Sequence, residues 1–320
     1  MFIVYSPRYR IDIGRHVFPT EKYQRVLAQL MASGIVSRDA IVEPAIATWD
    51  ELALVHTDEY LRKMREGTLS PEEVAQIELP WSADMVEGFR VMVGGTVATA
   101  RLACGLTPSS DDEAGAIDAP GPRIACHIGG GLHHAFANHG EGFCPFNDVA
   151  VAVRVLQQRG LDRIAIVDLD VHHGNGTSFI FEREPLVFTF SMHQQHNYPM
   201  WKPRGSLDIG LADGTGDEVY LTELERGLRE VMESRPQCVF YLAGADPYEE
   251  DQLGGLKLTL GGLRARDGMV MRAVRDARLP LIILLAGGYA RRVEDTVAIH
   301  CATIEEAASL DRAMPGPAGR

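Results

Sequence analysis

The sequence DLDVHHGNG at residues 168–176 directly follows an apolar, β-branched stretch that begins at residue 163. Such a stretch is typical of a strand that is buried on both faces of a parallel sheet. Asp170 and His172 lie two positions apart at the end of this strand, so both side chains can point to the same side. The motif therefore predicts a sheet whose strand ends carry a polar site.

Short apolar segments alternate with helical patterns along the rest of the chain. Further strands are expected at residues 2–5, 123–127, 186–191, 238–243 and 281–286. One helix is expected to begin after a cap at Thr20 and to end at Gly34, and another to begin at the capping sequence SPEE at 70–73. Further helices are expected at 84–103, 149–158, 217–233 and 263–277. The alternation predicts an α/β fold with a mostly parallel, doubly wound sheet flanked by helices. We expect one domain over residues 1–313, a flexible insertion at 107–122 and a disordered tail at 314–320.

Composition restricts the kind of partner. The 320 residues carry a net charge of −13, which repels phosphate backbones and predicts no direct nucleic-acid binding. A cationic substrate is favoured instead. The five cysteines include no C-x-x-C pair, and most lie in apolar runs, as expected for buried, reduced thiols in a cytoplasmic protein. The start MFIVYSPRY has no basic region and no long apolar stretch, so neither a signal peptide nor a membrane span is expected.

A third carboxylate follows another predicted strand. Asp246 in GAD at 244–246 would complete an Asp/His/Asp set with Asp170 and His172. Three protein ligands leave a fourth position for water or substrate, as catalytic zinc requires. A single aspartate at a strand end more often forms a turn or a cap, but the run at 168–176 together with Asp246 favours a metal site.

Two adjacent histidines follow the glycines of GGGLHH at 129–134. His133 or His134 can act as a general base, because imidazole titrates near working pH. Asp168 can orient one of the two rings and Asn175 the other. A phosphate-binding loop is the alternative, but His134 stands where G-x-G-x-x-G needs its last glycine, and no Walker-type lysine follows.

Two aromatic residues complete the candidates. The glycine pair in AGGY at 286–289 can present the Tyr289 hydroxyl to an oxyanion, although a tyrosine at an interface is the commoner case. Phe143, in GFCPFND at 142–148, can form one wall of a narrow apolar slot, although by itself a core phenylalanine is more common.

Taken together, GGGLHHA, GFCPFND, DLDVHHGNGT, GADPYEEDQLGGL and AGGY resemble the histone deacetylase superfamily in order and spacing over nearly the whole chain. Within it, YSPRY, HVFPTEKY, VHTDEYL and DQLGGLKLTLGGLRARD are similar to the class IV branch and its bacterial relatives. The resemblance implies an arginase-like α/β fold with zinc bound by the Asp/His/Asp set. It implies His133 and His134 as the tandem pair, with His134 favoured as the general base, and Tyr289 as the oxyanion donor.

The resemblance also implies a tunnel for the substrate and a second metal. Gly142 matches the carbonyl that accepts from the substrate amide, Phe143 matches one tunnel wall, and Tyr198 is the candidate for the other. Asn175 stands where class I members have an aspartate. The residues that match a structural potassium site are the side chains of Asp168 and Ser191 and the backbone carbonyls of Asp170, His172 and Met192.

The function implied is a zinc-dependent amidohydrolase that removes acetyl or longer acyl groups from acylated lysine. The segment 194–199 lacks the bulky class I pattern, so medium or long acyl groups remain a hypothesis beside acetyl. One alternative is an amidohydrolase of acetylpolyamines or other small acyl-amines, and another is a catalytically silent protein that binds acyl-lysine. A ureohydrolase would need two metals. The expected partner is the acylated substrate, with no nucleic acid and no membrane.

Overall fold

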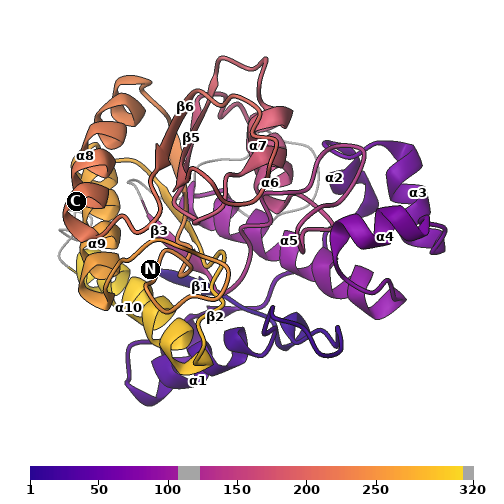
Figure 1. The fold of residues 1–320 in the computed structure, drawn as a ribbon, viewed down its shortest axis with the longest axis horizontal. Helices are drawn as coiled ribbons and strands as arrows, with labels where there is room; N and C mark the ends of the chain where they lie inside the picture. The colour runs from indigo at the N-terminus through magenta and orange to yellow at the C-terminus, as the bar shows by residue number, and fades with distance from the viewer. Residues whose placement is uncertain (107–122, 313–320) are drawn as a thin grey trace, which may run out of the picture.

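The computed structural model describes residues 1–106 and 123–312, so the expected insertion and tail lie outside the described residues. Within these ranges eight strands form one sheet in the order β2-β1-β3-β8-β7-β4-β5-β6, and every pairing is parallel. Figure 1 shows the sheet between two groups of helices. The strands are β1 (Phe2–Val4), β2 (Ile41–Val42), β3 (Ile124–His127), β4 (Ile164–Asp168), β5 (Val187–Gln194), β6 (Leu207–Leu211), β7 (Cys238–Leu242) and β8 (Leu281–Leu284).

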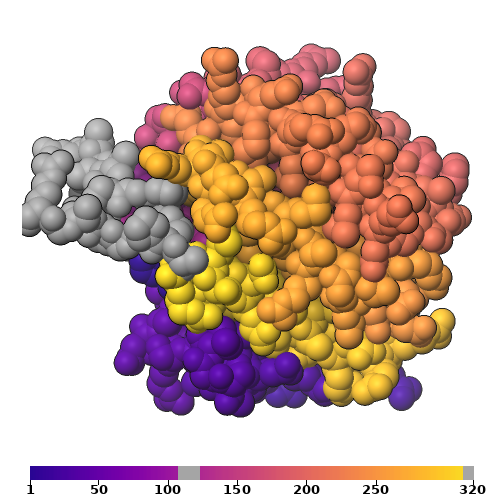
Figure 2. Space-filling model, turned by 90° about the vertical axis from the view of Figure 1, so that its left-hand side faces the viewer, coloured from indigo at the N-terminus to yellow at the C-terminus, as the bar shows by residue number. Residues whose placement is uncertain are grey.

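Helices cover both faces of this sheet, which confirms the predicted doubly wound α/β fold. On one face α8 packs against α9, α9 against α10 and α10 against α1, a row that Figure 2 shows from outside. On the other face α5 packs against α6 and contacts β1 and β3. The helices are α1 (Lys22–Ala32), α2 (Trp49–Ala53), α3 (Asp58–Glu66), α4 (Pro71–Ile77), α5 (Ala83–Ala103), α6 (Asp148–Gln157), α7 (Asn175–Ile180), α8 (Asp217–Glu233), α9 (Leu260–Asp276) and α10 (Val293–Arg312), with short 3-10 turns at Pro7–Tyr9 and Arg38–Ala40.

The central strands are buried on both faces, as their composition predicted. Every residue of β3, β4, β7 and β8 is buried. These four strands are consecutive neighbours in the sheet, so the loops at their carboxyl ends meet at one edge. In open parallel sheets, ligands bind beyond that edge.

The edge strands and one helix start differ from the predictions. β2 has only two residues, and β6 alternates exposed and buried residues around a glycine, so neither carries the apolar run of a central strand. Thr20 does not cap α1, because its hydroxyl donates to the Ile11 carbonyl at 2.8 Å and Glu21 occupies the cap position. The capping box at Ser70 is confirmed. The Glu73 backbone N–H donates to the Ser70 hydroxyl, and the Glu73 carboxylate accepts from the Ser70 backbone N–H.

All five cysteines are free and buried, as predicted. None of the helices in the described ranges combines the length and apolarity needed to cross a bilayer.

A buried ion pair ties α9 to the sheet behind the carboxyl edge. The Arg266 guanidinium contacts Asp267 Oδ1 through Nε at 2.9 Å and Nη2 at 2.8 Å, and both side chains are fully buried. Asp267 also accepts from the hydroxyls of Tyr241 in β7 and Thr303 in α10. Arg266 Nη1 donates to the Gly244 carbonyl at 2.6 Å, which fixes the loop after β7.

We expect Asp267→Asn to lower the free energy of unfolding by about 3–5 kcal/mol, because it leaves the buried Arg266 charge without its partner. Urea unfolding followed by circular dichroism measures the change. Asp276→Asn at the end of the same helix is the control, since its pair with Arg275 is exposed and should contribute little. Equal stabilities for the two variants would contradict this role.

Candidate active site

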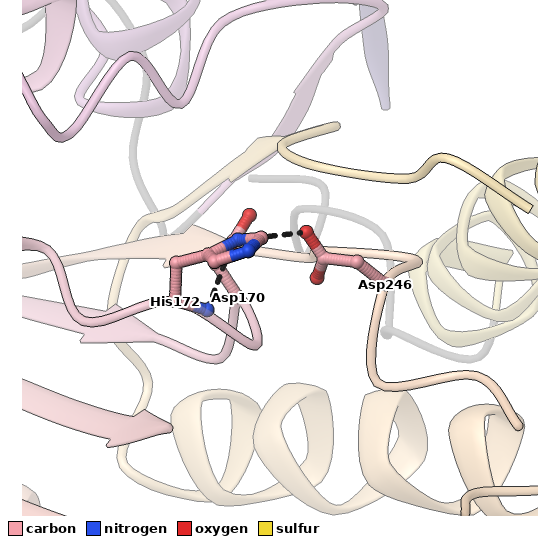
Figure 3. A group of neighbouring side chains, drawn as sticks. All are labelled: Asp170, His172 and Asp246. Carbon is pink, nitrogen blue, oxygen red and sulfur yellow. Dashed lines mark hydrogen bonds and ion pairs between the residues drawn. The ribbon is translucent and has the colours of Figure 1, made fainter. Parts of the chain in front are cut away.

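Three side chains from two paired strands converge at the carboxyl edge of the sheet. Asp170 and His172 lie just beyond β4, and Asp246 faces them from the loop after β7 (Figure 3). Each offers one ligand atom, and these atoms all lie within 4.8 Å of one another. Over residues 1–106 and 123–312 this is the one group of its kind, and all three side chains are buried. The structure thus brings together the set that the sequence predicted, and the set can hold a metal ion.

The charges in this cluster favour a cation. Asp246 Oδ2 is buried and makes no hydrogen bond within the described part of the chain, although His172 Nδ1 lies 3.5 Å away. Burial and the neighbouring Asp170 carboxylate raise the pKa of Asp246 to about 7. Two buried carboxylates side by side repel each other unless a proton or a metal ion compensates them. One histidine and two carboxylates fit a divalent transition metal such as zinc or iron.

Glycines let the loops approach this cluster. Gly287 donates its backbone N–H to Asp170 Oδ2 at 2.9 Å, and a Cβ at this position would collide with the carboxylates of both Asp170 and Asp246. The backbone N–H of Val171 donates to Asp246 Oδ1 at 2.9 Å. The loops after β8 and β4 therefore hold both carboxylates through main-chain donors.

The tandem histidines lie beside the cluster at the end of the glycine loop after β3. His133 Nδ1 contacts Asp168 Oδ2 at 2.6 Å, and its Nε2 lies 3.1 Å from His134 Nε2. Burial alone would lower the pKa of His133, but the carboxylates of Asp168 and Asp170 outweigh it and raise this pKa to about 9. Burial, followed by the neighbouring rings of His133 and His172, lowers the pKa of His134 well below its usual value. His134 is thus the neutral ring of the pair.

Asp148 holds the glycine loop in place, a role that the sequence did not suggest. Its carboxylate accepts from the backbone N–H groups of Gly131 at 3.0 Å and Leu132 at 2.7 Å, and from the Thr96 hydroxyl at 2.5 Å. Gly130 and Gly131 have φ angles of 80° and 78°, which favour glycine. Asp148 ends the GFCPFND motif, so its place in the motif was the available signal.

Asn175 connects the second histidine to a carboxylate outside the predicted set. Asn175 Oδ1 lies 2.7 Å from His134 Nδ1, and its Nδ2 donates to Glu141 Oε1 at 2.7 Å. The Tyr198 hydroxyl donates to the same oxygen at 2.9 Å. No pattern in the sequence marks Glu141, because its partners lie 34 and 57 residues away.

A narrow opening leads to the cluster between aromatic rings. A vestibule of about 200 Å³ is lined by Phe143, Tyr198, Tyr289 and Gly142 among others. The rings of Phe143 and Tyr289 lie 5.9 Å apart, and the ring of Tyr198 lies 5.1 Å from that of His134. The residues predicted to form a tunnel therefore line one opening together with His134 and His172.

A smaller cavity of about 30 Å³ adjoins the vestibule, since both are lined by His134, Phe143 and Tyr289. The residues that line only the smaller cavity include Gly131, Leu132, Ala286 and the buried Lys22. Lys22 Nζ donates to the Ala286 carbonyl at 3.1 Å, and burial lowers the pKa of Lys22 to about 8. The cavity beside Asp170 and His172 is thus small, and one lysine side chain is part of its lining.

Tyr289 lies beside the Asp/His/Asp set. Its backbone N–H donates to Asp251 Oδ2 at 2.7 Å, and its ring centre lies 6.5 Å from that of His172. Burial and the carboxylates of Asp170 and Asp246 raise the pKa of Tyr289 well above its usual value. The phenol therefore keeps its proton and can donate a hydrogen bond.

Comparison with known proteins places this geometry in a family. Residues 16–304 match the family model of the histone deacetylase domain. The chain is 40% identical to an uncharacterised protein of Picosynechococcus sp. over 93% of this chain and 95% of that protein. It is 32% identical to histone deacetylase 2 of Arabidopsis thaliana over 92% and 77%, and 30% identical to the acetoin utilization protein AcuC of Bacillus subtilis over 80% and 69%.

Solved structures share the fold. A homologue of histone deacetylases complexed with SAHA superposes with a TM-score of 0.79 at 23% identity, covering 96% of this chain and 84% of that one. A homologue from Aquifex aeolicus gives the same TM-score and coverage at 22% identity. These matches establish an arginase/deacetylase-like α/β fold, and the family match over residues 16–304 establishes that the chain belongs to the histone deacetylase family.

Proposed function

We propose that this protein is a zinc-dependent amidohydrolase that removes acetyl groups from acylated lysine side chains. The observation that carries the proposal is the convergence of three kinds of group at one narrow opening: the Asp/His/Asp set, the tandem histidines and the Tyr289 phenol. The family and its deacetylase-named relatives support hydrolysis of acetylated amides in general.

The chain's own residues provide for each stage of an amide hydrolysis. A divalent metal held by the Asp/His/Asp set supplies Lewis-acid chemistry, polarising a carbonyl and making water more acidic. His134, neutral and buried, accepts the proton of the attacking water. The Tyr289 hydroxyl donates to the oxyanion of the tetrahedral intermediate. A protonated histidine of the pair then returns a proton to the leaving amine.

The walls of the opening suit a linear side chain. The aromatic side chains of Phe143 and Tyr198 line the opening together with Gly142, whose backbone carbonyl is our candidate acceptor for the substrate amide. The smaller cavity of about 30 Å³ supports acetyl rather than the longer acyl groups that the sequence left open, because a longer chain would overpack it.

A small acyl-amine is the second candidate substrate. Glu78 is exposed and lines the vestibule, so a carboxylate faces the entrance on a chain of net charge −13. This arrangement favours a cationic group near the scissile amide, as in an acetylpolyamine. The silent-binder alternative is less well supported, because a binder has no need for a phenol beside the metal ligands.

A structural potassium ion is also part of the proposal. Asp168 pairs in register with Ser191 on the neighbouring strand β5, and Met192 follows in the same strand. The carbonyls of Asp170 and His172 belong to the loop that follows β4. Asp168 Oδ1 accepts a hydrogen bond from the backbone N–H of Asp170 at 3.2 Å, and carboxylate, hydroxyl and carbonyl oxygens are the kinds of ligand that a potassium ion would need.

The substrate prediction is tested by kcat/KM across one lysine peptide bearing acetyl, butyryl, octanoyl or myristoyl groups, together with acetylated polyamines. We expect acetyl-lysine to be the best peptide substrate, with a steady fall as the chain lengthens. A preference for octanoyl or myristoyl would contradict the small acyl cavity. A preference for acetylpolyamines would favour the second candidate, and no turnover of any acylated amine would refute the proposed function.

Tyr289→Phe should lower kcat by roughly 10²–10³ with little change in KM, since it removes one oxyanion donor. Metal content and thermal unfolding should match the wild type. Tyr5→Phe, which removes a buried hydroxyl away from the opening, is the matched control. A Tyr289→Phe enzyme with near-wild-type kcat would show that this ring only packs.

Gly287→Ala should abolish tight metal binding, because the new Cβ collides with the carboxylates of Asp170 and Asp246. Mass spectrometry of metals in protein purified without added metal should find one divalent metal per wild-type chain. Gly261→Ala is the control, since its Cβ meets nothing closer than Thr259 Oγ1 at 3.5 Å. Full metal content in Gly287→Ala, or two tight transition metals in the wild type, would contradict the predicted site.

A further inference from the structure

The side-chain amide of Asn175 is held between a histidine and a carboxylate. Its Nδ2 lies 2.7 Å from Glu141 Oε1, and its Oδ1 lies 2.7 Å from His134 Nδ1. Asn175 is buried, and its position at the first residue of α7 leaves the amide little freedom. Both ends of the amide are therefore engaged at short distances.

The chemistry of these partners determines which end of the amide faces which group. An ionised carboxylate only accepts hydrogen bonds, so the NH₂ end of Asn175 must face Glu141. The oxygen end then faces His134, and this oxygen can only accept. His134 Nδ1 must therefore carry a proton, which leaves Nε2 as the atom that can accept one.

The same reasoning assigns the proton on the other histidine, His133. Asp168 accepts from His133 Nδ1 at 2.6 Å, and the two Nε2 atoms lie 3.1 Å apart. The result is a continuous chain from Asp168 through His133, His134 and Asn175 to Glu141, with an acceptor-only carboxylate at each end. Both Nδ1 atoms are donors, and the two Nε2 atoms contact each other beside the cavity that both histidines line.

Glu141 is itself fixed by several donors. The Tyr198 hydroxyl donates to Oε1 at 2.9 Å, Gln76 Nε2 donates to Oε2 at 3.3 Å, and His139 Nε2 lies 3.6 Å from Oε2. Burial would raise the pKa of Glu141, but these hydrogen bonds outweigh it and lower the pKa below its usual value. Two backbone hydrogen bonds with Cys144 also hold the Glu141 main chain. The carboxylate is thus charged and well ordered.

We propose that Glu141 is a positioning residue: through Asn175 it fixes His134 in the tautomer whose Nε2 can accept the proton of the attacking water. The assignment rests on the proposed function for its role in catalysis, whereas the tautomer can be tested without any substrate. It also explains how a neutral asparagine can orient His134: the carboxylate is still present, but it acts on His134 through the Asn175 amide instead of contacting the ring directly.

The direct test is the tautomer of His134 in long-range ¹H–¹⁵N correlation spectra of histidine-labelled protein, assigned with a His134→Gln variant. We expect the neutral Nδ1–H form in the wild type and loss of this single form in Glu141→Ala, where the amide is free to turn over. Glu182→Gln, which removes an exposed charge on the turn after α7, should leave the spectrum unchanged. A wild-type His134 protonated on Nε2, or an unchanged Glu141→Ala spectrum, would overturn the assignment.

Compensating variants test the role in catalysis. Glu141→Ala should lower kcat by about 10–100-fold, as is usual for groups that orient a reacting side chain. Asn175→Asp should also be impaired, because it places a second carboxylate against Glu141. The double variant Asn175→Asp/Glu141→Gln again has one carboxylate and one amide, but with the carboxylate next to His134 and the amide at position 141. We expect its kcat to be higher than that of Asn175→Asp.

The outcomes separate the two hypotheses. A double variant no more active than Asn175→Asp, with all proteins folded by circular dichroism, would overturn the positioning role. A wild type that is inactive on every acylated amine would refute the proposed function, while the spectra would still decide the tautomer.

Discussion

The structure around the site depends on two like charges buried side by side. Asp170 and Asp246 come from neighbouring strands, and one oxygen of Asp246 has no hydrogen-bond donor among the described residues. Such a pair is unfavourable in a protein interior unless a cation or proton compensates it. The surroundings reduce this cost in part: backbone N–H groups of Val171 and Gly287 donate to the two carboxylates, and His172 lies against both. The remaining unsatisfied charge is what makes the site suited to a metal.

Rigidity behind the site comes from a second set of buried charges. Arg266 is fully buried, pairs with Asp267 and donates to the carbonyl of Gly244, two residues before Asp246. On the glycine-loop side, Asp148 performs the equivalent task through the backbone of Gly131. In both places a buried side chain positions a loop by a main-chain hydrogen bond. Because the site lies in loops rather than in the strands themselves, these interactions determine where the reactive side chains can lie.

Much of this arrangement could be predicted from sequence, for identifiable reasons. The central strands are apolar on both faces, so composition predicted them, and Asp170 and His172 are close in sequence, so their spacing predicted that they would lie together. The edge strands β2 and β6 could not be predicted, because a two-residue strand and a strand of mixed polarity carry no distinctive pattern. Thr20 has the right residue type for a cap, yet a tertiary hydrogen bond to Ile11 uses its hydroxyl instead. Glu141 could not be assigned, since its contacts form only when distant segments pack together.

The two histidines of the pair differ in what holds them. His133 is oriented by Asp168, the last residue of a central strand, whose position follows from the sheet. His134 is oriented through Asn175 by Glu141, whose carboxylate lies at the rim, where its side chain keeps 15% of its exposure. The same Glu141 oxygen accepts from Tyr198, a wall of the vestibule. A substrate that displaces the Tyr198 hydroxyl would therefore alter the carboxylate that orients His134. His133 is thus oriented by the sheet itself, whereas His134 is connected to Tyr198, a wall of the vestibule, through three hydrogen bonds in series.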